Sequence, residues 1–247
     1  MKITLRLFFL LIAFISCDSE NNIDQNVTVT LKFTQNWDGI SINPSDFSNF
    51  NFTNENGELI SIERLRYLVS NISLGDETKP YQLINIGENS GFEINFDNIS
   101  KGLQNLQFRF GFQNSDNIDG IYLDLNSVSF NVPTMLGGGY HFMQFDGKYK
   151  DINNNDANFN YHAIRAVDKT DPDNLIFEDT SFFVDFGNFD IKKNTTIEIQ
   201  MNVAEWFKNP NTWNLNELNT MLMPNFEAQK LISQNGTSVF SLGEVSH

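Results

Sequence analysis

Two histidines are the residues whose type and spacing best suit a chemical role in this chain. Of the three histidines, His247 is the C-terminal residue, and chain ends are usually poorly ordered. His141 follows three consecutive glycines, which permit an unusual backbone path into a strand. His162 follows a polar loop, residues 150–157, of a length that joins neighbouring strands. A hairpin over this region would bring the two imidazoles close together.

A methionine near the first histidine adds a soft donor. On an extended segment His141, Met143 and Phe145 share one face, since side chains alternate along a strand. Imidazole and thioether groups suit copper. The pattern therefore predicts a copper or similar transition-metal site made of His141, His162 and Met143. The alternative is that the two histidines face each other as polar or hydrogen-bonded groups without a metal.

The loop between the histidines permits a second metal hypothesis. Asp151, Asn153 and Asn155 match the opening of a calcium loop. Asp156 occupies the glycine position and His162 the glutamate position, so an EF-hand is excluded. A looser calcium site and a plain Asn-rich turn both fit what remains, and the turn is favoured.

Catalytic patterns are missing from the sequence. There is no Gly-x-Ser-x-Gly elbow and no Walker or dinucleotide-binding pattern. Two candidate histidines leave few choices for a general base, and no base, nucleophile and oxyanion donor can be named together. We therefore expect a protein that is not an enzyme.

Tryptophans offer a different binding hypothesis. Trp37, Trp206 and Trp213 could line a sugar-binding platform, because sugars stack on indole rings. Nothing in their spacing places them together, so packing is the favoured interpretation.

The net charge of the chain limits the classes of partner that it is expected to bind. A formal net charge of −15 argues against nucleic acid, which requires clustered Lys and Arg. The same charge attracts cations. It disfavours direct attraction to anionic lipid, so any membrane attachment should rest on acyl chains.

The N-terminus has the features of an export signal. Lys2 and Arg6 precede an apolar stretch, residues 7–15, that is too short to span a bilayer. Cys17, the only cysteine, follows Ser16, where a lipobox places the residue that becomes lipidated. We expect a signal peptide over 1–16, a lipidated Cys17 with a flexible polar tether over 17–26, and an outer-membrane lipoprotein of the cell envelope facing the periplasm or the cell surface.

Short alternating runs predict the fold of the remaining chain. Period-two hydrophobic patterns recur between turns rich in Asn, Asp and Gly, and the 24 phenylalanines suit a β core. We expect a single mainly β domain over 27–247, an antiparallel sandwich or barrel-like fold with one or two short C-terminal helices. The runs cover residues 27–33, 65–69, 81–86, 106–110, 140–145, 181–186 and 195–201, and the helices 203–208 and 226–234.

The order of these segments resembles the MbnP-like family. The specific parts are residues 66–72 (RYLVSNI) and 139–147 (GYHFMQFDG), followed by His162, and the resemblance extends over residues 27–245. Members of this family are exported β proteins related to a methanobactin-associated copper protein, and many are lipoproteins of Bacteroidetes. The resemblance implies copper binding with histidine ligands: His162 matches the histidine that closes the hairpin, and His141 matches a position that is often histidine in Bacteroidetes-like members.

One departure from the family pattern concerns tryptophan. The namesake branch carries an oxidised tryptophan beside the metal, whereas residues 132–136 of this chain (VPTML) contain none. Met135 or Met143 is a conjectural substitute. The resemblance favours copper scavenging, storage or delivery; the rival hypothesis is a metal-independent β-sandwich that binds or adheres to a protein or glycan partner.

Overall fold

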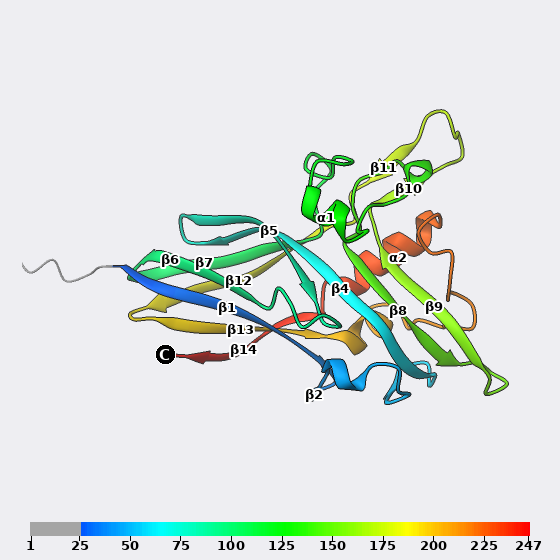
Figure 1. Ribbon diagram of the computed structural model, residues 1–247, viewed down its shortest axis with the longest axis horizontal. Helices are drawn as coiled ribbons and strands as arrows, with labels where there is room; N and C mark the ends of the chain where they lie inside the picture. The colour runs from blue at the N-terminus through cyan, green and yellow to red at the C-terminus, as the bar shows by residue number, and fades with distance from the viewer. Residues whose placement is uncertain (1–25) are drawn as a thin grey trace, which may run out of the picture.

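Strands are the predominant secondary structure of the computed structural model, which describes residues 26–247 (Figure 1). The predicted mainly β fold is confirmed. The predicted signal peptide, Cys17 and nearly all of the tether lie outside the described residues. Within residues 26–247, none of the helices has the length and apolar character needed to cross a bilayer.

Residues 26–247 contain fourteen strands and five short helical segments. The strands are β1 (Asn26–Trp37), β2 (Ile40–Ser41), β3 (Phe52–Thr53), β4 (Leu59–Leu74), β5 (Glu77–Asn85), β6 (Glu93–Ser100), β7 (Gly102–Phe110), β8 (Met143–Lys150), β9 (Asp156–Ala163), β10 (Ala166–Asp168), β11 (Ile176–Glu178), β12 (Phe182–Ile191), β13 (Thr195–Asn202) and β14 (Phe240–Ser246). The α-helices are α1 (Leu123–Ser127) and α2 (Phe226–Gly236), and the 3-10 helices are η1 (Pro44–Asp46), η2 (Thr134–Leu136) and η3 (Val203–Phe207).

The strands form two large sheets and one hairpin. One sheet has the order β14-β13-β1-β2, with β6 also on β1; the other has the order β12-β7-β4-β8-β9, with β3 and β5 also on β4. The hairpin is β10-β11. The sheet pairs are antiparallel as expected except for β1 with β13, which run parallel. Sequence periodicity could not reveal this, because strand direction depends on the connection between strands.

Aromatic side chains fill the space between the two large sheets. Phe33 of β1 meets Phe108 of β7 at a ring-centre distance of 5.8 Å, and Phe108 in turn meets Phe240 of β14 at 5.1 Å. These edge-to-face contacts join one sheet to the other. The interpretation of phenylalanine as core filler holds for these rings, whereas Phe183 is 57% exposed.

The long strand β4 sets the position of the candidate site. Its first half pairs with β8 and its second half with β7. Between them the Leu68 N–H donates to the Phe142 carbonyl, and the Leu68 carbonyl accepts from the Gly111 N–H. The segment between β7 and β8 therefore leaves the sheet and returns to it at this one residue, and His141 lies at the point of return.

Local sequence signals account for the C-terminal helices. The Asn225 side chain caps α2 by accepting from the Ala228 N–H, which confirms the predicted helix. The predicted stretch before Pro210 is the 3-10 helix η3. The five-residue helix α1 was not predicted, since it is too short to show a periodic pattern.

Local geometry bears on two subsidiary hypotheses. Trp37, Trp206 and Trp213 are all buried, so the packing interpretation is correct and they form no exposed platform. The Asp151 carboxylate accepts from the N–H groups of Asn153 and Asn155, each at 2.8 Å, which is the arrangement of an Asn-rich turn.

Candidate metal centre

Three consecutive glycines with a left-handed backbone conformation precede His141 and determine its position. Gly137, Gly138 and Gly139 have φ of 84°, 65° and 85°, a region that residues with a Cβ rarely adopt. A Cβ on Gly137 would also lie 2.3 Å from the Phe177 ring. The glycines therefore permit both the backbone path and the close packing of the neighbouring hairpin, as the sequence indicated.

One carbonyl fixes the orientation and the tautomer of the His141 ring. The Phe130 carbonyl accepts from the His141 backbone N–H at 3.0 Å and lies 2.9 Å from His141 Nδ1. Gln144 Nε2 lies 3.2 Å from the same Nδ1. The shorter contact to the carbonyl favours a proton on Nδ1, which places the lone pair of the neutral ring on Nε2. Burial, followed by the nearby His162, lowers the pKa of His141 to about 3. The ring is therefore neutral at physiological pH and able to act as a ligand.

The register of the β8-β9 hairpin places His162 beside an acidic side chain. His162 pairs with Gln144, and Asp146 pairs with Asn160, so His162 and Asp146 are diagonal neighbours on one face. His162 Nε2 lies 2.7 Å from Asp146 Oδ1. The Nε2–H donates to the carboxylate, which leaves the lone pair on Nδ1.

His162 Nδ1 is buried and has no hydrogen-bond partner within residues 26–247. Buried polar atoms are almost always paired. An imidazole that donates one N–H to a carboxylate and leaves its other nitrogen free is the arrangement of histidines that ligate metals. This atom is therefore a clear sign of a ligand site within the described residues.

Asp146 is held as a carboxylate by several donors. It accepts from Asn160 Nδ2 at 2.6 Å and from Arg64 Nε at 2.5 Å, in addition to His162. Burial alone would raise the pKa of Asp146, but the hydrogen bond and charge of His162 and the hydrogen bonds from Asn160 and Arg64 outweigh it and hold the pKa well below its usual value. The carboxylate therefore holds the His162 ring in one orientation through the hydrogen bond from Nε2–H.

The two imidazoles lie together, as the predicted hairpin implied. Their ring centres are 5.1 Å apart and their planes are almost perpendicular, at 83°. His141 is 3% exposed and His162 is 8% exposed, so both rings are sheltered from water.

The predicted methionine does not join them. Met143 begins β8 and is completely buried in the aromatic core between the sheets. It lies on the opposite face from Gln144, because neighbouring strand residues alternate. His141 precedes β8 at a bend. The alternation of side chains along β8 therefore does not include His141, and Met143 does not share its face. A different methionine is present: Met223 Sδ lies 3.2 Å from His141 Nε2.

A buried glutamine ties the Met223 segment to the His162 strand. Gln229 of α2 donates from Nε2 to the carbonyls of His162 and Leu222, at 2.9 and 3.0 Å. Its Oε1 accepts from the Ile164 N–H at 2.8 Å. Residues more than 60 positions apart in the sequence are thereby held in fixed relation. Met223 itself packs on a small apolar cluster that includes Val132 and Leu136.

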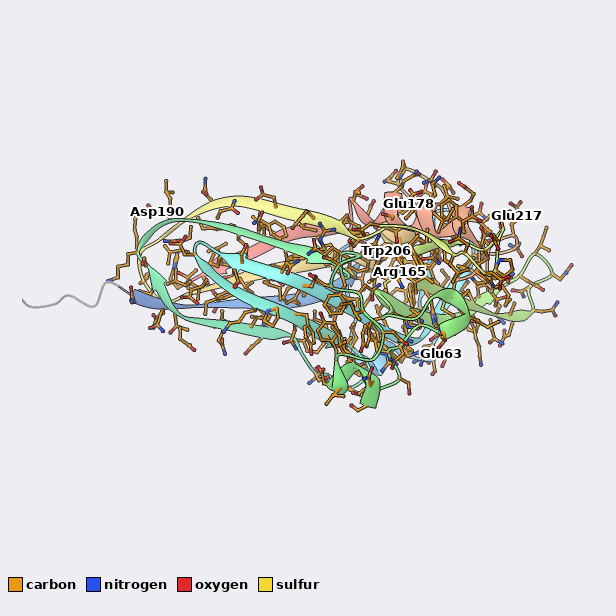
Figure 2. The ribbon with its side chains drawn as sticks, turned by 90° about the horizontal axis from the view of Figure 1, so that it is seen from above. Glu63, Arg165, Glu178, Asp190, Trp206 and Glu217 are labelled. Atoms are coloured by element: carbon orange, nitrogen blue, oxygen red, sulfur yellow. The ribbon has the colours of Figure 1, made fainter. Side chains whose placement is uncertain are left out.

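An open depression reaches the outer side of this network. It has a volume of about 560 Å³ and its lining includes Arg64, Asp146 and Asn160. Figure 2 shows Glu63, which also lines it, and Arg165, which donates to the Gly137 carbonyl, in the half of the molecule away from Asp190. Asp146 therefore stands between the buried imidazole of His162 and solvent.

Sequence reasoning missed Asp146, Met223 and Gln229. The turn at 151–155 contained a usable signal for Asp146: a hairpin centred there pairs His162 with Gln144 and makes Asp146 its diagonal neighbour. No comparable signal exists for Met223 or Gln229, since their contacts with the histidines are long-range.

Comparison with known proteins identifies the fold and the family. No curated protein matches the chain. The structure is similar to that of MbnP from Methylosinus trichosporium, with a TM-score of 0.56 and 13% sequence identity over 87% of this chain and 98% of that chain. The sequence model of the MbnP family matches residues 26–224. The matched range includes Met223 and ends before α2, whereas the resemblance was expected to extend to residue 245. Since the match covers most of the sequence, this chain belongs to the MbnP family.

Proposed function

We propose that this protein binds copper, or a similar transition metal, through His141 and His162 and serves in its scavenging, storage or delivery. The observation that carries this proposal is the unpartnered, buried Nδ1 of His162 beside a second imidazole whose Nδ1–H is already engaged by the Phe130 carbonyl. Each ring thus keeps one lone pair free. Imidazole nitrogens of this kind suit copper and its neighbours in the first transition row.

The ring geometry supports a shared ion. Two imidazoles whose nitrogens each lie about 2.0 Å from one metal, at a roughly tetrahedral angle, hold their ring centres roughly 5 Å apart. The separation here is 5.1 Å. The Asp146 carboxylate accepts from His162 and the Phe130 carbonyl accepts from His141, and hydrogen bonds of this kind orient ligand histidines and fix their tautomers.

Family membership points in the same direction. The MbnP family is associated with methanobactin and copper, and both histidines fall within the matched range. Residues 132–136 lack the tryptophan of the namesake branch, so a site built on an oxidised tryptophan is not proposed for this chain.

We further propose that the protein acts in the cell envelope as a lipoprotein anchored through Cys17. Strand β1 begins at Asn26 at one end of the molecule, whereas β8, β9 and α2 lie toward the other end (Figure 1). A lipid anchor on Cys17 would therefore hold the metal site away from the membrane, where a soluble donor or acceptor of the metal has access.

The test is a competition titration of Cu(I), Cu(II) and Zn(II) against the mature chain, residues 17–247, with Cys17→Ser to remove the thiol. His141→Ala and His162→Ala are each expected to weaken copper binding by at least about 100-fold, because loss of a group that only hydrogen-bonds to a ligand already costs about 10–100-fold in metal affinity. Circular dichroism of each variant checks that the fold is retained. Copper affinity that is unchanged in the double variant would refute the proposal and favour the metal-independent binding module.

A further inference from the structure

We infer that the end of the molecule at which β1 begins is a membrane-contact surface. Lysines of two neighbouring turns there bind the phosphate groups of anionic phospholipids and orient the protein on the bilayer. The inference rests on the proposed anchor at Cys17 and goes beyond it, because an anchor limits the distance of the domain from the membrane but does not fix which side faces it. This surface, the lysine end, consists of residues 101–103 and 191–194.

Strand pairing brings the two turns of the lysine end together beside the start of β1. One turn joins β6 to β7, and the other joins β12 to β13. Gly102 of β7 pairs with Ile191 of β12, and Asn26 of β1 pairs with Ser100 of β6. Figure 1 shows the start of β1 and both turns at the same end of the molecule. The chain therefore enters the domain, on the side of Cys17, through the surface that carries these turns.

The segment between Cys17 and Asn26 is short enough to keep the lysine end near the bilayer. Residues 18–25 are eight residues, and a fully extended chain of this length spans at most about 30 Å. Charges in solution act over about one Debye length, which is about 8 Å at physiological salt. The side chains of the lysine end are therefore the first of the domain to come within reach of the phospholipid headgroups.

The lysine end differs in charge from the chain as a whole. Lys101, Lys192 and Lys193 are all exposed. Lys192 forms an ion pair with Asp190 at 2.8 Å, but its side chain is 76% exposed, and an exposed pair of this kind is weak enough to exchange for a phosphate group. Three lysines against the exposed carboxylates of Asp97 and Asp190 leave this end weakly positive, whereas the net charge of the chain is −15.

The opposite half of the molecule carries exposed carboxylates. Glu63, Glu178 and Glu217 are exposed and lie in the half away from Asp190 (Figure 2). An anionic bilayer attracts the lysine end and repels this half, so the field of the membrane aligns the molecule. In that alignment the β8-β9 hairpin, which carries His162, points away from the lipid.

An exposed leucine adds an apolar contact to the lysine end. Leu103 is 72% exposed and follows Lys101 by two positions. Apolar side chains flanked by lysines suit the headgroup region of a bilayer, because the apolar group enters the acyl boundary while the ammonium groups stay with the phosphates. The acyl chains on Cys17 supply most of the affinity, and the lysine end determines the orientation.

The test measures which end of the anchored protein touches lipid. The mature chain, residues 17–247, is coupled through Cys17, its only cysteine, to a maleimide-bearing lipid in vesicles of brominated phosphatidylcholine with or without phosphatidylglycerol. Bromine quenches tryptophan fluorescence on contact, and the unsubstituted chain gives the background. We expect Leu103→Trp to be quenched in vesicles that contain phosphatidylglycerol. Ile152→Trp, in the β8-β9 turn where the isoleucine is 87% exposed, should not be quenched.

Two triple variants of the Leu103→Trp chain separate local charge from net charge. One replaces the lysines of the lysine end: Lys101→Gln, Lys192→Gln and Lys193→Gln. The matched control removes the same charge from elsewhere: Lys148→Gln, Lys169→Gln and Lys230→Gln. We expect the first variant to lower the ratio of lipid-contacting to free orientations by more than about 10-fold, since each lysine near an anionic surface contributes about 5-fold, and the control to change it little. About 1 M salt, which shortens the Debye length to about 3 Å, should reproduce the first variant.

The outcomes distinguish this inference from the proposed anchor. Equal quenching in the two triple variants, or quenching that does not depend on phosphatidylglycerol, would overturn the inference and leave the anchor unaffected, because the lipid is attached chemically. Lipidation is measured separately, by mass spectrometry of the protein recovered from cell membranes. An unmodified Cys17 would refute the proposed anchor and this inference with it.

Discussion

The two faces of the β8-β9 hairpin arise from one alternating pattern of side chains but have different roles. On one face Met143, Phe145, Phe159 and Tyr161 are buried in the aromatic core, and even the Tyr161 hydroxyl donates to the Trp206 carbonyl at 2.8 Å. On the other face Gln144, Asp146, Asn160 and His162 form a polar network that leaves the buried His162 Nδ1 without a partner.

The difference shows how one hairpin can separate stability from ligand binding. The core face satisfies each group by packing or by an internal hydrogen bond, so nothing on it is available to a ligand. The site face keeps one donor atom free at the cost of burying it unpaired, which is unfavourable for folding. Buried unpaired atoms of this kind occur at positions where the atom has a function other than stabilising the fold.

The largest expected effect comes from the core face. Phe145→Ala removes a fully buried ring that meets Phe159 at 5.1 Å and Phe207 at 5.7 Å. We expect the free energy of unfolding to fall by about 3–5 kcal/mol, measured by urea denaturation of the metal-free chain. Copper affinity of the folded protein should change little. A loss of stability under about 1 kcal/mol would contradict the assignment of this face to the core.

An intermediate effect is expected from the site face. Asp146→Asn keeps the shape of the side chain but removes the charge that supports His162. We expect copper affinity to fall by about 10–100-fold in a competition titration. Asp190→Asn is the matched control, because it removes the same charge from an exposed ion pair with Lys192 at the far end of the molecule (Figure 2). Equal losses in the two variants would mean that only net charge matters.

The smallest effect is expected from Met143→Leu. The substitution exchanges two apolar side chains of similar volume inside the core, so the free energy of unfolding should change by less than about 1.5 kcal/mol. Copper affinity should be unaffected, since the side chain lies on the face away from the histidines. A clear loss of copper binding would mean that this methionine reaches the site after all.

Local pattern was sufficient for much of the fold. Alternation predicted strands within β1, β4, β5, β7, β8, β12 and β13, and Asn225 marked the start of α2. The short pieces β2, β3, β10, β11 and α1 were not predicted, because two to five residues carry too little periodic signal. The parallel pairing of β1 with β13 depends on how distant segments meet.

The sequence by itself determined that the chain has two histidines available for a site and that a hairpin connects the segments that carry them, because the polar loop between these segments has a length that joins neighbouring strands. Only the tertiary structure decided the remaining features. It placed Met143 in the core and brought Met223 to His141 across 82 positions of sequence. The physical reason is that the face on which a side chain lies follows from the alternation of its own strand. A set of ligands depends instead on contacts between separate elements, which are fixed by packing and by buried hydrogen-bonding residues such as Gln229.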